Sequence, residues 1–155
     1  MLYVLMTYNT KLMTYDKAEW HYGGNFPAGL KPESGSTHIG MFLAWIIENN
    51  LISNFHLRES SESVQQVKQR HMTGREFLLK ECDERLWDED LNEEGNAFAQ
   101  VYYKSEDDYE QYFDDYENVF DQYKTLYHVE DTWENYDKLK PLIDESFRDW
   151  QKRIH

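Results

Sequence analysis

The sequence predicts a mainly α-helical, single-domain bundle with room for a small β element. Its 155 residues suit one compact domain, and its aromatic residues, at 16%, supply apolar area for one core. Apolar side chains recur at helical spacing in several segments, without internal repeats. We expect the domain to span residues 13–155. Because Met-Thr-Tyr recurs at Met13 as an alternative start, residues 1–12 are expected to form an N-terminal extension, with disorder as one alternative.

A central helix is expected after the Gly- and Pro-containing segment between Gly23 and Pro32. Ser36 or Thr37 can cap its start, and Asn49 suits its end. Apolar residues occupy both sides of the intervening helix: Ile39, Met41, Phe42, Leu43, Ala44, Trp45, Ile46 and Ile47. A helix that is apolar nearly all round belongs in the core of the domain.

Two further helices are expected between residues 59 and 82. The polar segment 59–70 has few apolar positions, which is typical of a surface helix. Thr73 and Glu76 are spaced as a capping box, in which each side chain accepts a hydrogen bond from the other residue's backbone N–H. The helix that they begin would bury Cys82 as a small apolar side chain, because the neighbouring acids would raise the pKa of its thiol.

The C-terminal half contains one ambiguous segment and one long helical pattern. Segment 91–103 fits one face of a helix, which we favour, although residues 98–103 could also form a short strand. Apolar residues at helical spacing predict a final helix over residues 132–154. Pro141 interrupts this helix and should either kink it or divide it into two.

The clearest helical pattern follows Ser105, which can cap a helix whose first residues are acidic. One stripe is almost purely aromatic: Tyr109, Tyr112, Phe113, Tyr116, Val119, Phe120 and Tyr123. A second stripe consists of carboxylates: Asp107, Glu110, Asp114, Glu117 and Asp121. At about 100° per residue the centres of the two stripes lie roughly 140° apart. We therefore expect the aromatic face to be buried and the acidic face to point at solvent or at a partner.

Negative charge is concentrated in one part of the chain. Residues 81–121 contain 16 acids and only two bases, Arg85 and Lys104, so their charge of −14 equals the net charge of the whole chain. At physiological salt the field of such a block extends about 8 Å into solvent. The block is either a solvated face that maintains solubility or a docking surface for a basic partner. Nucleic acid is disfavoured as a direct partner, because a polyanion would be repelled.

The histidines form no recognisable catalytic or metal-binding motif. Six are scattered along the chain: His21, His38, His56, His71, His128 and His155. None has the spacing of HExxH or of paired ligands, and a single cysteine excludes a multi-thiolate zinc site. A histidine–acid pair such as His21 with Glu19, or His128 with Glu130, is more often structural than catalytic. We therefore expect no catalytic residues and no metal site.

A partial calcium-loop pattern also falls short of a cofactor site. Asp88, Asp90 and Asn92 match the first ligand positions of such a loop. The match then fails, because Glu93 replaces the required glycine and Ala99 replaces the final glutamate. Weak binding of divalent cations by these acids is one alternative, but we expect no dedicated calcium site and no cofactor.

The expected compartment is the cytoplasm. A lone cysteine excludes an internal disulfide and fits a reducing environment. The longest dense apolar run, residues 39–47, is far shorter than the ~20 residues that a membrane span needs. The first residues lack the charged start and the cleavage site of a secretory signal. We expect no membrane association.

Four runs of the sequence resemble a family of small acidic bacterial proteins. They are YDKAEWHY at residues 15–22, THIGMFLAW at 37–45, LNEEGNAFA at 91–99 and YHVEDTW at 127–133. The resemblance extends from about Met13 to the C-terminus and leaves residues 1–12 outside it. The family is associated with immunity proteins of polymorphic toxin systems, including type VI effectors. The resemblance therefore implies a protein partner and supplies no catalytic residues.

We expect an immunity protein that binds the basic surface of a cognate toxin, such as a nuclease, through its carboxylates. Opposite charge speeds such an encounter, and aromatic residues dominate many interfaces. The expected contact residues are Trp87, Asp88, Glu89, Asp90, Glu93, Glu94, Tyr103, Asp107, Glu110, Asp114, Glu117, Asp121 and Tyr127. Two alternatives stay open: a general mimic of nucleic acid that inhibits several basic proteins, and a small enzyme with a pocket at His21 and His38.

Overall fold

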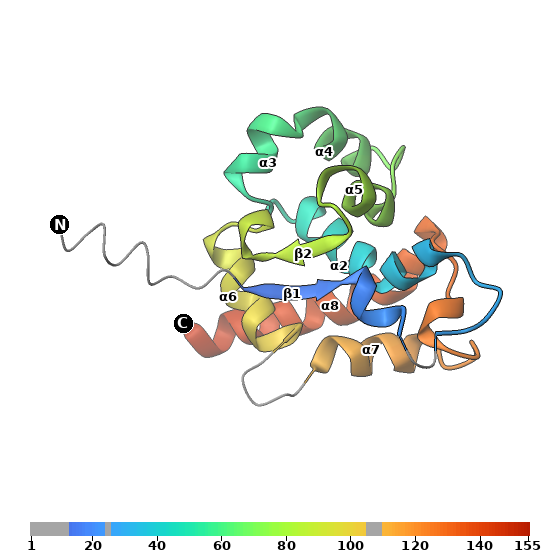
Figure 1. Cartoon of the computed structure of the whole chain (residues 1–155). Coiled ribbons are helices and arrows are strands. Elements are labelled where there is room, and N and C mark those ends of the chain that lie inside the picture. The colour runs from blue at the N-terminus through green and yellow to red at the C-terminus, as the bar shows by residue number, and fades with distance from the viewer. Residues whose placement is uncertain (1–12, 24–25, 105–109) are drawn as a thin grey trace.

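The computed structural model describes residues 13–23, 26–104 and 110–155. The elements follow in this order along the chain (Figure 1): β1 Thr14–Lys17, η1 Ala18–His21, η2 Pro32–Ser36, α2 Thr37–Glu48, α3 Asn54–Glu59, α4 Ser61–Lys68, α5 Gly74–Glu81, β2 Arg85–Trp87, η3 Asp88–Asp90, α6 Glu93–Tyr102, α7 Gln111–Val119, η4 Leu126–His128 and α8 Trp133–Ile154. The expected mainly helical fold with a small β element is confirmed.

Helix α2 is the buried centre of the molecule, as its apolar composition predicts. Every residue from Thr37 to Ile47 is buried. The backbone of α5 crosses α2 closely at two glycines, where a Cβ added to Gly74 would lie only 1.8 Å from the carbonyl oxygen of Gly40. Any side chain at this crossing would push the two helices apart. Because His38 lies in the first turn of α2, the same packing fixes its position.

The two short strands pair antiparallel across the middle of the fold (Figure 1). A bulge lies between Thr14 and Asp16, where the register shifts by one residue against β2. In a regular strand neighbouring side chains point to opposite faces, but a bulge re-aims one of them. Tyr15 and Asp16 are therefore both buried. Tyr15 bonds through its hydroxyl to the side chain of Asn96 at 2.6 Å, whereas Asp16 faces histidines.

One hydrophobic cluster joins the chain from Tyr15 to Trp150, and much of it is aromatic. Phe42 of α2 lies among rings from α6, α7 and the turn between them. Several of the core rings donate hydrogen bonds to acids: Tyr102 to Asp115, Tyr103 to Asp16, Tyr136 to Glu48 and Trp45 to Asp144. The Tyr hydroxyls and the Trp N–H thus supply hydrogen bonds to carboxylates at the edge of the core, in place of lysine or arginine side chains.

Most of the predicted helices are confirmed. The capping box of Thr73 and Glu76 begins α5, which buries Phe77 and Leu78, and Cys82 behind it is 6% exposed. Segment 91–103 is helical rather than a strand over Glu93–Tyr102. The polar segment 59–70 contains α4, anchored by two buried valines.

The structure corrects the bounds of one helix, decides one alternative and adds one helix. The helix predicted after Ser105 begins at Gln111, with Glu110 as its N-cap, and ends at Val119, while residues 105–109 lie outside the described part of the chain. Helix α8 runs continuously through Pro141 and is not divided, since its other turns bury an apolar stripe against the core. Helix α3 was not expected; Ser53 caps it by accepting a bond from the backbone N–H of His56.

Two further expectations concern the ends and the environment of the chain. The extension expected at residues 1–12 lies outside the described residues. Among the helices of the described part, none is long and apolar enough to cross a bilayer.

Candidate functional site

A buried polar cluster, called here the Asp16 centre, joins five side chains: Asp16, His21, His38, Tyr103 and Tyr127. The carboxylate of Asp16 accepts bonds on both oxygens. Oδ1 lies 2.8 Å from His21 Nε2 and 2.9 Å from the backbone N–H of Lys17. Oδ2 lies 3.0 Å from His38 Nε2 and 2.6 Å from the Tyr103 hydroxyl. These donors fill the lone-pair sites of an ionised carboxylate, so Asp16 is satisfied in its charged form.

Five separate elements position the Asp16 centre. The β-bulge turns Asp16 inward, and η1, which directly follows β1, places His21 beside Asp16. His38 comes from the first turn of α2, and Tyr103 ends α6. Tyr127 belongs to η4, where its hydroxyl lies 2.7 Å from His21 Nδ1. The cluster therefore assembles only in the folded protein.

The two histidine rings differ in their surroundings. His21 has both ring nitrogens in hydrogen bonds, and its side chain is 15% exposed. His38 is fully buried, and its Nδ1 has no hydrogen-bond partner among the described residues. The rings meet edge to face with centroids 4.5 Å apart. Because each Nε2 faces a carboxylate that can only accept, each carries a proton in this arrangement. Among the described residues, the centre is thus partly exposed at His21 and Tyr127 and closed at His38.

Electrostatics at the Asp16 centre favour the charged acid and a neutral His38. Burial by itself would raise the pKa of Asp16, but hydrogen bonds from His21 and His38 hold that pKa well below its usual range. Burial lowers the pKa of His38, although Asp16 opposes this shift. Burial and the charge of Asp16 raise the pKa of Tyr103 far above 10.0, so its hydroxyl stays a donor.

A second buried cluster consists of His56, Cys82 and Asp90. His56 Nε2 lies 2.7 Å from Asp90 Oδ1 and 3.7 Å from the sulfur of Cys82, and its Nδ1 lies 3.0 Å from Ser60 Oγ. The other oxygen of Asp90 accepts from the backbone N–H of Trp87. Burial raises the pKa of Cys82 strongly, and Asp90 adds to this shift. This cluster ties α3 to η3 and leaves the thiol unreactive.

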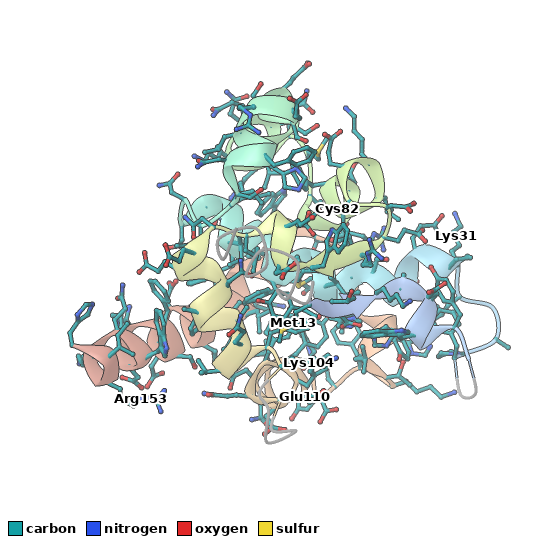
Figure 2. The ribbon with its side chains drawn as sticks, turned by 60° about the vertical axis from the view of Figure 1, so that its left-hand side comes forward. Met13, Lys31, Cys82, Lys104, Glu110 and Arg153 are labelled. Carbon is teal, nitrogen blue, oxygen red and sulfur yellow. The ribbon has the colours of Figure 1, made fainter. Side chains whose placement is uncertain are left out.

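The acidic face predicted for α7 is present in the described residues. Glu110, Asp114, Glu117 and Asp121 are exposed, while Tyr112 and Tyr116 on the opposite side are buried. Glu110 immediately precedes α7, and Figure 2 labels it together with Lys104 at the end of α6. We call these four acids the α7 acidic face. Asp107, which was expected to extend it, lies outside the described residues.

The other predicted acids form a separate group at the start of α6. Glu89, Glu93 and Glu94 are exposed, and Asp88 is half-buried with its Oδ2 accepting from the backbone N–H of Met13. Asp90 is only 4% exposed and bonds to His56, so its predicted role in partner contact is wrong. Because the length of α6 separates this group from α7, it is not continuous with the α7 acidic face among the described residues (Figure 1).

Three outer acids of the α7 acidic face, Asp114, Glu117 and Asp121, form no ion pair with a lysine or arginine in the described residues. Within the described part of the chain, the ion pairs of lysine and arginine involve acids outside the acidic segment: Glu19, Glu48, Asp131, Asp137 and Asp144. Asp114, Glu117 and Asp121 form no such pair there. Their negative potential is therefore directed at solvent.

The predicted aromatic contact residues lie further inside than expected. Tyr103 is 1% exposed and bonds to Asp16, so its predicted role as a surface anchor is wrong. Trp87 is half-buried beneath the guanidinium of Arg85, 3.7 Å from its ring centre. Tyr127 is half-buried in the Asp16 centre. An exposed ring that the sequence did not suggest is Trp20, at 49% exposure, with Lys104 Nζ 4.8 Å from its centre.

Sequence reasoning also missed the Asp16 centre. The sequence pairs His21 with Glu19 and groups His21 with His38 only in the enzyme alternative, whereas the acid that both histidines contact is Asp16. The only sequence signal was that Asp16, His21 and His38 stand close together in the chain. A bulge in a four-residue strand leaves no clear pattern in sequence, so the inward turn of Asp16 could not be foreseen. The ligand atoms of these three residues lie within 4.8 Å of one another, as do those of His56, Cys82 and Asp90.

Comparison with known proteins gives a family but no activity. No curated protein and no solved structure matches the chain. One family model, described as a domain of unknown function (DUF7832), matches residues 14–129. That range contains the Asp16 centre and the α7 acidic face, and the whole of α8 lies beyond it. Because the match covers more than half of the sequence, the chain belongs to the DUF7832 family.

Proposed function

We propose that this protein is an immunity protein that binds and neutralises a cognate bacterial toxin in the cytoplasm. The observation that carries the proposal is the α7 acidic face, in which Asp114, Glu117 and Asp121 form no ion pair with a lysine or arginine of the described chain. A basic protein surface would supply the missing counter-charge. A toxin that cleaves nucleic acid has such a surface, because its active site must hold phosphates.

The rigidity of α7 supports this use of the acidic face. Tyr112 and Tyr116 are fully buried in the aromatic core, and Phe120 closes the end of the helix at 4% exposure. The carboxylates on the opposite side are thus held on a fixed frame. Because α7 is already ordered, its backbone would lose little conformational entropy when a partner binds, which favours affinity. The buried aromatic side of α7 therefore fixes the position of the exposed carboxylates.

Trp20 is the aromatic side chain best placed to contribute apolar contact beside the charges. It is half exposed, and it neighbours Lys104, which lies two residues after the end of α6. Exposed tryptophans are common among the residues that dominate binding energy. In the proposed complex it takes the anchoring role expected of Tyr103.

Co-expression with a toxin encoded by the neighbouring gene tests the proposal. The wild-type chain should protect the host cell and co-purify with the toxin at low salt. The variant Asp114→Lys with Glu117→Lys should protect less. The matched control, Glu59→Lys with Glu62→Lys, changes the net charge equally on α3 and α4, which lie on the far side of the fold from α7 (Figure 1). Failure of the wild-type chain to protect or to co-purify would overturn the proposal.

A further inference from the structure

The Asp16 centre brings two imidazoles and one carboxylate to a single point. Asp16 Oδ1 is 2.8 Å from His21 Nε2, and Asp16 Oδ2 is 3.0 Å from His38 Nε2. The ligand atoms of the three residues all lie within 4.8 Å. Two histidine nitrogens and a carboxylate oxygen are a donor set that suits Zn²⁺ and related transition metals. We propose that Asp16, His21 and His38 form a binding site for a zinc ion.

The contacts of the Asp16 carboxylate with the two histidines, one on each oxygen, are close to the ligand spacing of a tetrahedral zinc site. With bonds of about 2.0–2.1 Å, neighbouring ligand atoms in such a site lie roughly 3.3 Å apart. The contacts of Asp16 with His21 and His38, at 2.8 and 3.0 Å, need to widen by only a few tenths of an ångström. The rings meet edge to face, so both nitrogens can aim at one ion without overlap of the rings. A small outward rotation of the partly exposed His21 supplies the movement.

The groups around His21 and Asp16 match the outer contacts that hold metal ligands in place, whereas Nδ1 of His38 has no hydrogen-bond partner among the described residues. A ligating histidine commonly holds its other ring nitrogen in a hydrogen bond, which fixes the ring and its tautomer. His21 Nδ1 has such a contact with the Tyr127 hydroxyl at 2.7 Å. The hydroxyl of Tyr103 and the backbone N–H of Lys17 fix the carboxylate in the same way. Both hydrogen bonds to Asp16 can persist when the acid binds an ion.

Zinc binding would change the tautomer of both rings without releasing a proton. In the metal-free arrangement each Nε2 carries the proton that faces Asp16. In the bound form Nε2 of His21 and of His38 donates its lone pair, so the proton of each ring moves to Nδ1. At His21 the new Nδ1–H can donate to Tyr127, whose hydroxyl then acts as acceptor. The fourth position of the ion faces the exposed side of His21, where water can complete the site.

The cluster of His56, Cys82 and Asp90 is the competing site, and it is less suitable. All three residues are buried, so an ion has no open side from which to enter. Coordination by Cys82 would also require loss of its proton in an apolar position. The Asp16 centre is therefore the site that the structure assigns to zinc.

Calorimetric titration of metal-free protein with ZnCl₂ tests the assignment. The wild-type chain should bind one ion in a saturable step. His21→Gln should weaken binding by at least tenfold, and Tyr127→Phe, which removes only the contact to His21, by about tenfold. His128→Gln is the matched control, because His128 is partly exposed and lies outside the centre. Circular dichroism of each variant separates loss of the site from loss of the fold.

Two outcomes would overturn the proposal. The first is equal zinc affinity in His21→Gln and His128→Gln, which would place the ion on scattered surface groups, or no saturable binding at all. The second is loss of binding in Cys82→Ser with retention in His21→Gln, which would move the ion to the competing cluster. Cobalt supplies a second readout, because a thiolate ligand adds a charge-transfer band that the Asp16 centre cannot produce. The expected Co²⁺ spectrum has tetrahedral d–d bands and no thiolate band.

Discussion

The Asp16 centre and the α7 acidic face use the same chemical group in opposite ways. Asp16 is buried and has every lone pair engaged by donors from its own chain. Asp114 and Glu117 are exposed and have no lysine or arginine partner in the described residues. A buried carboxylate holds the fold together because removing its partners would be costly. An exposed one contributes little to the fold and is available to a partner. The comparison separates the acids that are held within the fold from those that are exposed and available to a partner.

The largest expected difference between the two regions lies in stability. Asp16→Asn should lower the free energy of unfolding by about 3–5 kcal/mol, because it leaves buried donors facing an amide instead of a carboxylate. Asp114→Asn should change it by less than about 0.5 kcal/mol, since its side chain is exposed. Urea unfolding of both variants measures the contrast. Similar losses in both would contradict the division of roles.

A smaller effect is expected for the hydroxyl groups of two buried tyrosines. Tyr103 donates to the ionised Asp16, so Tyr103→Phe should cost about 1.5–3 kcal/mol. The hydroxyl of Tyr116 is buried without a hydrogen-bond partner among the described residues, so Tyr116→Phe should be neutral or stabilising. Chemical denaturation of the pair gives the answer. The reverse order would show that the hydrogen bond at Asp16 does not hold the centre.

Acid should destabilise the metal-free protein in two stages. Because the pKa of His38 is lowered by burial, below about pH 6.5 the unfolded chain takes up a proton that the folded chain refuses. Stability therefore falls as the pH drops from 7 to 5. The pKa of Asp16 is also lowered, so its contribution is present above about pH 3.9 and is lost below that value. Urea midpoints measured in EDTA across this range report both stages.

The variant His38→Gln isolates the first stage, because its side chain does not titrate. It should be less stable than wild type at pH 7 and should show a flatter decline between pH 7 and 5. His128→Gln should keep the wild-type slope. If His38→Gln loses stability as steeply as wild type on acidification, another group is responsible for the decline.

The two regions also differ in how far the sequence predicts them, because one depends on local periodicity and the other on contacts between distant segments. The α7 acidic face was foreseen, because helical periodicity alone fixes which side chains share a face. The buried α2 and the capping box of α5 were foreseen for the same local reasons. These features depend on residues within a few turns of one another.

The Asp16 centre was not foreseen, because it depends on contacts between distant segments. Tyr103 is 87 residues from the acid that it contacts, and as an aromatic residue beside the acidic block it resembled a surface anchor. Asp90 likewise looked like one more acid of that block until its contact with His56 became visible. Charge patterns in sequence do not distinguish an acid that is buried with a histidine from one that faces solvent.

The rate of association with the cognate toxin, measured by stopped-flow mixing over a series of salt concentrations, tests the central proposal most directly. At low salt, Asp114→Lys with Glu117→Lys should slow association by about tenfold or more and flatten its salt dependence, since electrostatic steering would be lost. Glu59→Lys with Glu62→Lys should follow the wild-type curve closely. Equal rates for both double variants at every salt concentration would contradict the account, because the α7 acidic face would then be a solvated surface without a role in binding.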